Sequence, residues 1–175
     1  MATAFTHPVI ALGLFPWFKS IRNSYSILLT GMVLTALPDL DVIGYRYGIP
    51  YDHLLGHRGL THSIFFAAVF SALPTLYFSL RHKISFFPIW IFLFLSMASH
   101  GFIDAMTNGG LGIAFLSPFS NERYFLPFQP IEVSTLSIKR FFQGQGIAVM
   151  KSELLYIWPP AILLMLLGIL ARLRR

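Results

Sequence analysis

Four long apolar segments constrain the fold of this 175-residue chain more than any other feature of its sequence. Each is close to the twenty residues that a helix needs to cross a bilayer. The segments cover residues 24–45, 61–80, 86–107 and 153–173. Backbone groups in lipid must form hydrogen bonds within their own segment, so apolar stretches of this length form helices. A fifth apolar stretch, Ala4–Phe18, is shorter and contains Pro8 and Pro16. The sequence therefore predicts an all-α, polytopic membrane bundle of four full transmembrane helices and one shorter N-terminal helix.

The composition agrees with a membrane protein and excludes some kinds of site. Hydrophobic residues make up 55% of the chain and charged residues only 11%, whereas soluble domains carry about 25% charged residues. The chain has no cysteine, which excludes disulfides and thiolate-bound metals. We interpret residues 1–175 as a single membrane-embedded domain, with the connection 109–152 at one face of the bilayer.

The charged residues predict the orientation of the bundle. One set of helix ends carries only basic residues: Lys19, Arg22, Arg81, Lys83, Arg172, Arg174 and Arg175. All seven acidic residues lie at the opposite ends or in the long connection. The positive-inside rule places the basic ends, including the C-terminus, in the cytoplasm, and the connection 109–152 outside. The net charge of +6 is thus explained by topology, and we expect no nucleic-acid partner.

Most of the histidines and several carboxylates gather at the outer ends of these segments. They are His7, Asp39, Asp41, His57, His62, His100 and Asp104. Ionisable groups at membrane depth are costly and usually functional. Counted along their helices, Asp39 and His100 both rise about 20 Å from the cytoplasmic ends, at 1.5 Å per residue. Imidazole and carboxylate are ligands of zinc and related divalent ions. The pattern predicts a metal site built from four separate segments.

The spacing within each motif gives more specific expectations. His100 and Asp104 are four residues apart, so both point to one face of a helix and could share an ion; a water-bridged polar pair is the alternative. His57 and His62 flank a glycine-containing turn, and the guanidinium of Arg58 between them could bind a phosphate or a carboxylate, or pair with Asp52.

Asp39 and Asp41 follow Pro38 and are two residues apart. On a regular helix they would face about 200° apart. We therefore expect Asp39 to be a direct ligand and Asp41 to orient a histidine through a hydrogen bond.

These motifs together resemble one known family. Thr6-His7, Pro38-Asp39-Leu40-Asp41, the segment His57-Arg58-Gly59-Leu60-Thr61-His62-Ser63 and the pair His100/Asp104 are similar to motifs of the YdjM-type family. Its members are bacterial and archaeal inner-membrane proteins described as metal-dependent hydrolases, distantly related to zinc-dependent phospholipases C and single-strand nucleases. The resemblance covers about the first 110 residues, and the segment 57–63 is its most specific part.

The resemblance implies roles for individual residues. Asp39, His62, His100 and Asp104 would surround one metal ion, and Asp104 would bridge to a second ion bound by His7. In the relatives a free N-terminal amine assists the second ion; here the residues Met-Ala-Thr-Ala-Phe-Thr precede His7. The relatives carry further histidines downstream, whereas this chain has none after His100, so we expect one or two ions rather than three. His57 would replace a lost ligand or contact the substrate.

The resulting functional hypothesis is a membrane-bound hydrolase with catalytic residues Asp39, Asp104, Arg58 and His57 and metal ligands His7, Asp39, His62, His100 and Asp104. The cofactor would be zinc, with manganese as the alternative. Metal-activated water would cleave a phosphoester bond of a lipid or lipid-linked substrate at the outer face of the inner membrane. Lys139-Arg140 would anchor the connection to lipid headgroups or bind the anionic substrate. The competing hypotheses are a non-catalytic protein stabilised by its metal and an ion carrier.

Overall fold

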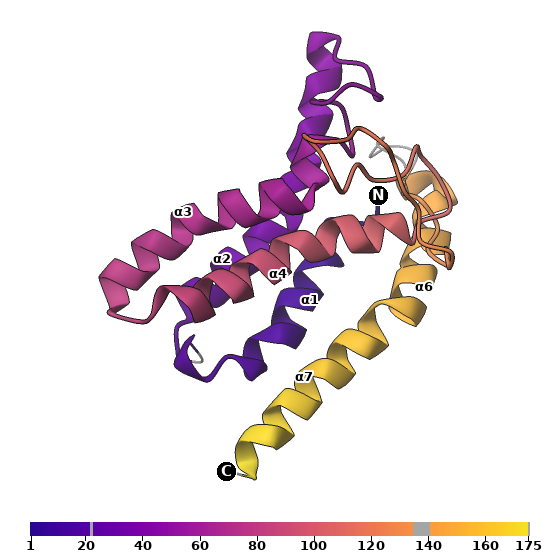
Figure 1. The fold of residues 1–175 in the computed structure, drawn as a ribbon. Helices are drawn as coiled ribbons and strands as arrows, with labels where there is room; N and C mark the ends of the chain where they lie inside the picture. The colour runs from indigo at the N-terminus through magenta and orange to yellow at the C-terminus, as the bar shows by residue number, and fades with distance from the viewer. Residues whose placement is uncertain (22, 135–140, 175) are drawn as a thin grey trace.

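The computed structural model describes the chain except for residue 22, residues 135–140 and residue 175, and its described part is helical (Figure 1). Its α-helices are α1 (His7–Leu14), α2 (Tyr25–Ala36), α3 (Ile64–His82), α4 (Phe86–Ala105), α6 (Gly146–Tyr156) and α7 (Trp158–Leu173). Tighter 3₁₀ segments are η1 (Phe15–Trp17), η2 (Lys19–Ile21), η3 (Leu37–Tyr47) and η4 (Leu60–His62), and η5 (Phe141–Gln145) is a π-helix. The described residues form no strand, only two isolated bridges in the connection after α4.

Four helical segments are long and apolar enough to cross a membrane, which confirms the predicted fold class. They are Tyr25–Tyr47, Ile64–His82, Phe86–Ala105 and Gly146–Leu173, with His7–Trp17 as a shorter apolar helix. The last span begins seven residues earlier than the sequence predicted, because α6 continues into α7 through Ile157. The end of the connection predicted for residues 109–152 is therefore helical.

The span that begins at Tyr25 changes character beside Pro38. Regular α-helix ends at Ala36, and the following eleven residues form the 3₁₀ helix η3. Proline cannot donate a backbone hydrogen bond and disfavours α-helix in the residue before it, which explains the position of the change. This switch determines how Asp39 and Asp41 are oriented.

Helix α4 is the centre of the bundle and packs against α1, α2 and α3, while α7 packs along α1. Its buried side chains include Phe92, Leu93 and Met97, and these belong to the main apolar core. Towards its C-terminal end α4 carries Gly101, where a Cβ atom would lie 2.8 Å from the backbone oxygen of His62. The absence of a side chain at Gly101 therefore allows the His62 segment to approach α4.

The two ends of the bundle differ in their connections (Figure 1). The α1–α2 turn, the α3–α4 turn and the C-terminus lie towards the lower left of the view, and the long connection after α4 lies at the upper right. Among the described residues, Lys19, Arg81 and Lys83 belong to the first group of ends. The pair Lys139-Arg140, expected to contact headgroups or substrate, lies outside the described residues.

Candidate metal centre

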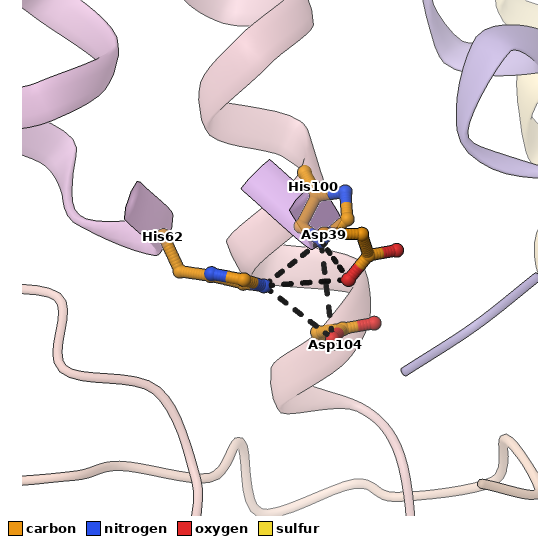
Figure 2. A group of neighbouring side chains, drawn as sticks. All are labelled: Asp39, His62, His100 and Asp104. Atoms are coloured by element: carbon orange, nitrogen blue, oxygen red, sulfur yellow. Dashed lines mark hydrogen bonds and ion pairs between the residues drawn. The ribbon is translucent and has the colours of Figure 1, made fainter. Parts of the chain in front are cut away.

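Four side chains from three separate segments converge near the C-terminal end of α4 (Figure 2). His100 and Asp104 come from α4, Asp39 from η3 and His62 from η4. One potential ligand atom of each lies within 4.8 Å of the others. All four residues are buried. The structure thus brings together the four residues that the resemblance assigned to one ion.

The distances describe a compact donor set. His62 Nε2 and His100 Nε2 are 3.0 Å apart. Asp39 Oδ1 lies 3.3 Å from His100 Nε2 and 3.7 Å from His62 Nε2. Asp104 Oδ2 lies 3.9 Å from each of these nitrogens. Two imidazole nitrogens and two carboxylate oxygens therefore face a common centre, which is a donor set that zinc and similar ions accept.

The other nitrogen of each imidazole has a partner outside this centre. His100 Nδ1 lies 2.6 Å from the carbonyl oxygen of Thr35, which can only accept, so Nδ1 carries the proton. His62 Nδ1 lies 3.2 Å from Asp41 Oδ2. Hydrogen bonds of this kind fix the ring orientation of metal-binding histidines and leave Nε2 available for the ion.

Asp41 organises the segment that carries His62. Its carboxylate accepts hydrogen bonds from Thr61 Oγ1 at 2.7 Å and from the Arg58 backbone N–H at 3.2 Å, and it lies 2.7 Å from His57 Nδ1. In a 3₁₀ helix with three residues per turn, positions 39 and 41 face different directions, so one carboxylate reaches the centre and the other reaches this segment. Asp41 occupies the orienting position that the sequence analysis predicted for it.

Several buried polar atoms at the centre have no hydrogen-bond partner in the described structure. They are both ring nitrogens of His7, both carboxylate oxygens of Asp39, Asp104 Oδ2 and Arg58 Nε. Buried polar atoms in proteins are ordinarily paired, and each exception needs an explanation such as an ion or water. Because most of these atoms are ligand types, the residues fit a divalent cation.

Asp104 also faces the N-terminal segment with its other oxygen. The Ala2 backbone N–H donates to Asp104 Oδ1 at 2.8 Å, and His7 Nε2 lies 3.7 Å from the same oxygen. The His7 ring stacks on that of His100 with centroids 3.9 Å apart. The Met1 amine is 3.9 Å from Asp104 Oδ2. Asp104 thus faces the other three residues of the cluster and also the N-terminal segment, through His7, the Ala2 N–H and the Met1 amine.

Arg58 is fully buried and its guanidinium is held by the protein. Nη1 donates to the Gly109 carbonyl oxygen at 2.7 Å, Nη2 donates to Thr107 Oγ1 at 2.8 Å, and Nε lies 3.3 Å from Asp104 Oδ2. The structure places Arg58 beside Asp104, and not beside Asp52, which was the carboxylate considered for it on sequence grounds. Arg58 can stabilise the negative charge of Asp104, while its two Nη atoms are occupied.

His57 and two acidic residues of the connection after α4 lie in different surroundings. His57 is buried against Asp41 and forms with Asp41 and His62 a second group of potential metal ligands. Glu132 accepts a hydrogen bond from Asn108 Nδ2, and Glu122 accepts one from Tyr124 Oη. The partners Thr35 and Thr107 were not identified from sequence. Thr35 acts through its backbone carbonyl, which leaves no signal in a search for ligand side chains.

Replacing Asp41 with asparagine is expected to weaken zinc binding by roughly 10–100-fold, because an amide cannot accept all the hydrogen bonds that hold His57, Arg58 and His62 in place. The measurement is a competitive zinc titration of the purified protein in detergent. Asp52→Asn, at an exposed position between η3 and η4, is the control. Equal affinities for wild type and Asp41→Asn would show that Asp41 does not support His62.

The affinity for zinc is also expected to depend on pH. Burial disfavours the charged form of His62, but hydrogen bonds to Asp39 and Asp41 outweigh burial and raise its pKa to about 9. Zinc must displace this proton, so its affinity should rise by about tenfold per pH unit below pKa and level off above it. Zinc titrations at several pH values below and above this pKa test the dependence. A zinc affinity that does not change with pH below the pKa would contradict it.

Comparison with known proteins agrees with the motifs of the candidate centre. The model of the YdjM inner membrane protein family matches residues 1–175, so the similarity extends beyond the first 110 residues. Inner membrane protein YbcI of Escherichia coli (strain K12) is 36% identical over 165 residues, which cover 94% of this chain and 95% of that protein. No solved structure matches the chain. With four potential spans and a family match over its whole length, the chain is a multi-pass membrane protein that belongs to the YdjM inner membrane protein family.

Proposed function

We propose that this protein is a membrane-embedded, metal-dependent hydrolase that cleaves a phosphoester bond of a lipid or lipid-linked substrate at the outer face of the inner membrane. The observation that carries the proposal is that buried histidine and aspartate ligand atoms converge on one centre, where the oxygens of Asp39, Asp104 Oδ2 and the ring nitrogens of His7 have no hydrogen-bond partner among the described residues. Such an arrangement is costly unless a cation completes it.

Asp39, His62, His100 and Asp104 would hold one divalent ion, most simply zinc, with manganese as the alternative. Asp104 Oδ1 and His7 would contribute to a second ion, because His7 Nε2 lies 3.7 Å from Oδ1, whereas His62 and His100 face Oδ2 of the same carboxylate. A bound divalent ion lowers the pKa of its water towards neutrality and polarises a phosphoryl group.

The protein's own residues supply orientation and charge. Asp41 keeps the His62 ring in place, and Arg58 balances the charge of Asp104. The side chain of Asp39 is 9% exposed, while those of His62, His100 and Asp104 are 0% exposed. Asp39 is therefore the least enclosed residue of the cluster, although both of its carboxylate oxygens are themselves buried, and we assign it to hold the proton of the attacking water. His57 Nδ1 lies 2.7 Å from Asp41 Oδ1, so His57 would help to hold the carboxylate that orients the His62 ring.

The distribution of charge supports the outer face as the location. The basic residues Arg81 and Lys83 lie in the α3–α4 turn, at the opposite end of α4 from His100 and Asp104. The positive-inside rule assigns that turn to the cytoplasm. A site at the other end, near the boundary of the bilayer, is suited to a substrate that is itself anchored in lipid.

A metal with a purely structural role is the second candidate. It is favoured by one observation, namely that the cluster offers four protein ligands and all four are buried. Structural zinc is ordinarily closed by four protein ligands, whereas catalytic zinc keeps a position for water. An ion carrier has less support, because the fully buried ionisable side chains of the described residues lie at one end of the bundle.

The test is hydrolysis of phosphatidylglycerol and phosphatidic acid in mixed micelles with the zinc-loaded protein, measured as release of water-soluble phosphate. Wild type should release phosphate and His100→Ala should not. His82→Ala, in the turn at the other end of the bundle, should behave as wild type. Stoichiometric zinc with no hydrolysis, and a cobalt spectrum unchanged by added phosphate, would favour the structural role instead.

A further inference from the structure

Glu153 is a fully buried carboxylate that has no place in the metal cluster. It lies in α6, and the hydrogen bonds that its side chain makes with described residues go to the N-terminal segment, about 150 residues away in the sequence. Glu153 Oε2 accepts from Thr3 Oγ1 at 2.6 Å and from Thr6 Oγ1 at 2.7 Å, and Oε1 accepts from the Thr3 backbone N–H at 2.5 Å. Three donors on a single buried carboxylate make a strong attachment, because hydrogen bonds to a charged group are stronger than neutral ones.

The attached segment also contributes to the candidate metal centre. Ala2, directly before Thr3, donates its backbone N–H to Asp104 Oδ1 at 2.8 Å. His7, directly after Thr6, stacks on His100 and approaches Asp104. Glu153 thus holds the segment between the two points at which the segment meets the centre.

A second contact from the C-terminal helices reinforces this attachment. Trp158 Nε1, at the start of α7, donates to Thr6 Oγ1 at 3.2 Å. The hydroxyl of Thr6 therefore joins Glu153 and Trp158, and both come after α4 in the chain, whereas the cluster residues belong to η3, η4 and α4. The C-terminal helices bind the N-terminal segment through polar contacts as well as through apolar packing.

We propose that Glu153 is a positioning residue that places His7 in the metal centre by fixing residues 3–6. This inference rests on the proposed metal centre and adds to it a residue from the C-terminal third of the chain. Glu153 acts through His7 and touches no ligand of the ion itself.

The first test is a cobalt titration of the full-length protein in detergent, followed by absorption. Glu153→Ala should lower the Co²⁺ affinity by roughly 10–100-fold, as removal of outer partners of a metal site usually does. Glu153→Gln keeps one acceptor oxygen but loses the charge and the second acceptor, so it should lose less affinity than Glu153→Ala without reaching wild type. Glu132→Ala, which removes an acidic residue bound to Asn108 and not to the N-terminal segment, should leave the affinity unchanged.

A double-mutant cycle with His7→Ala separates positioning from general stability. If Glu153 acts by placing His7, Glu153→Ala should have little further effect in the His7→Ala background. An equal loss of affinity in both backgrounds would overturn the proposal. Thr6→Val and Thr6→Ser provide a milder pair, in which only the valine variant lacks the hydroxyl that Glu153 binds.

Hydrogen exchange of the metal-free protein tests the attachment without any ion. The Ala2 and Thr3 amides should exchange faster in Glu153→Ala than in wild type, while amides in the middle of α4 should not change. Unchanged exchange at Ala2 and Thr3 would overturn the proposed role of Glu153. Absence of cobalt binding in wild type would instead contradict the metal centre, so the two failures are distinguishable.

Discussion

Replacement of His100 or Asp104 by alanine is expected to abolish stoichiometric metal binding. The wild-type protein should contain one or two equivalents of zinc or manganese, and either variant should contain less than about a tenth of an equivalent. His100 provides one of two imidazole donors and stacks on His7. Asp104 faces His62, His100 and His7 with its two oxygens. Loss of either residue removes a ligand from a four-residue set, and remaining polar atoms cannot replace it.

The measurement is elemental analysis of protein purified in detergent without chelators. His82→Ala is the matched control, because His82 ends α3 beside Phe78 in the turn remote from the cluster. It should retain the full metal content. Wild-type protein without stoichiometric metal would contradict the metal centre, and metal retained in both His100→Ala and Asp104→Ala would contradict its ligand assignment.

The fold could be predicted from the sequence because the bilayer imposes it. Segment length and apolarity alone gave the four spans and the shorter N-terminal helix. Local details needed the structure. The pattern around Pro38 indicated a distorted helix, but a 3₁₀ helix of eleven residues depends on its packing against the His57–His62 segment. The early start of the last span at Gly146 was also missed, since Glu153 made residues 146–152 look like part of a polar loop.

Spacing and common depth indicated that these histidines and carboxylates gather, and the resemblance to the YdjM-type family suggested which of them share an ion, but neither indicated how the residues are connected. His100 and Asp104 share a helix face, so their proximity was predictable. Sequence could not show that Arg58 would select Asp104 over Asp52, because that choice depends on how the turn after Gly56 folds. Glu153 was read as one more acidic residue at an outer end, although its partners are Thr3 and Thr6 at the other end of the chain. Contacts between residues about 150 positions apart produce no local pattern in the sequence.

Arg58→Met is expected to destabilise the protein more than any other single substitution outside the apolar core. Arg58 is fully buried, and its side chain joins Asp104 to Thr107 and to the carbonyl oxygen of Gly109. Methionine is of similar length and carries no donor, so the Asp104 carboxylate and the Gly109 carbonyl would lose their partners while remaining buried. Breaking a buried ion pair by removing one partner costs about 3–5 kcal/mol.

Lysine at position 58 should recover only part of this loss, because a single ammonium group cannot reach three acceptors in the geometry of a guanidinium. Thermal unfolding in detergent, followed by circular dichroism, should therefore give the highest unfolding temperature for wild type, an intermediate one for Arg58→Lys and the lowest one for Arg58→Met. Arg46→Met, at an exposed position of η3, is the control and should unfold at the same temperature as wild type.

Added zinc should raise the unfolding temperature of wild type more than that of Arg58→Met, because Asp104 without the Arg58 guanidinium is no longer held towards His62 and His100. An Arg58→Met protein as stable as wild type would mean that Asp104 is balanced by another cation, and the bound metal ion itself would then be the first candidate.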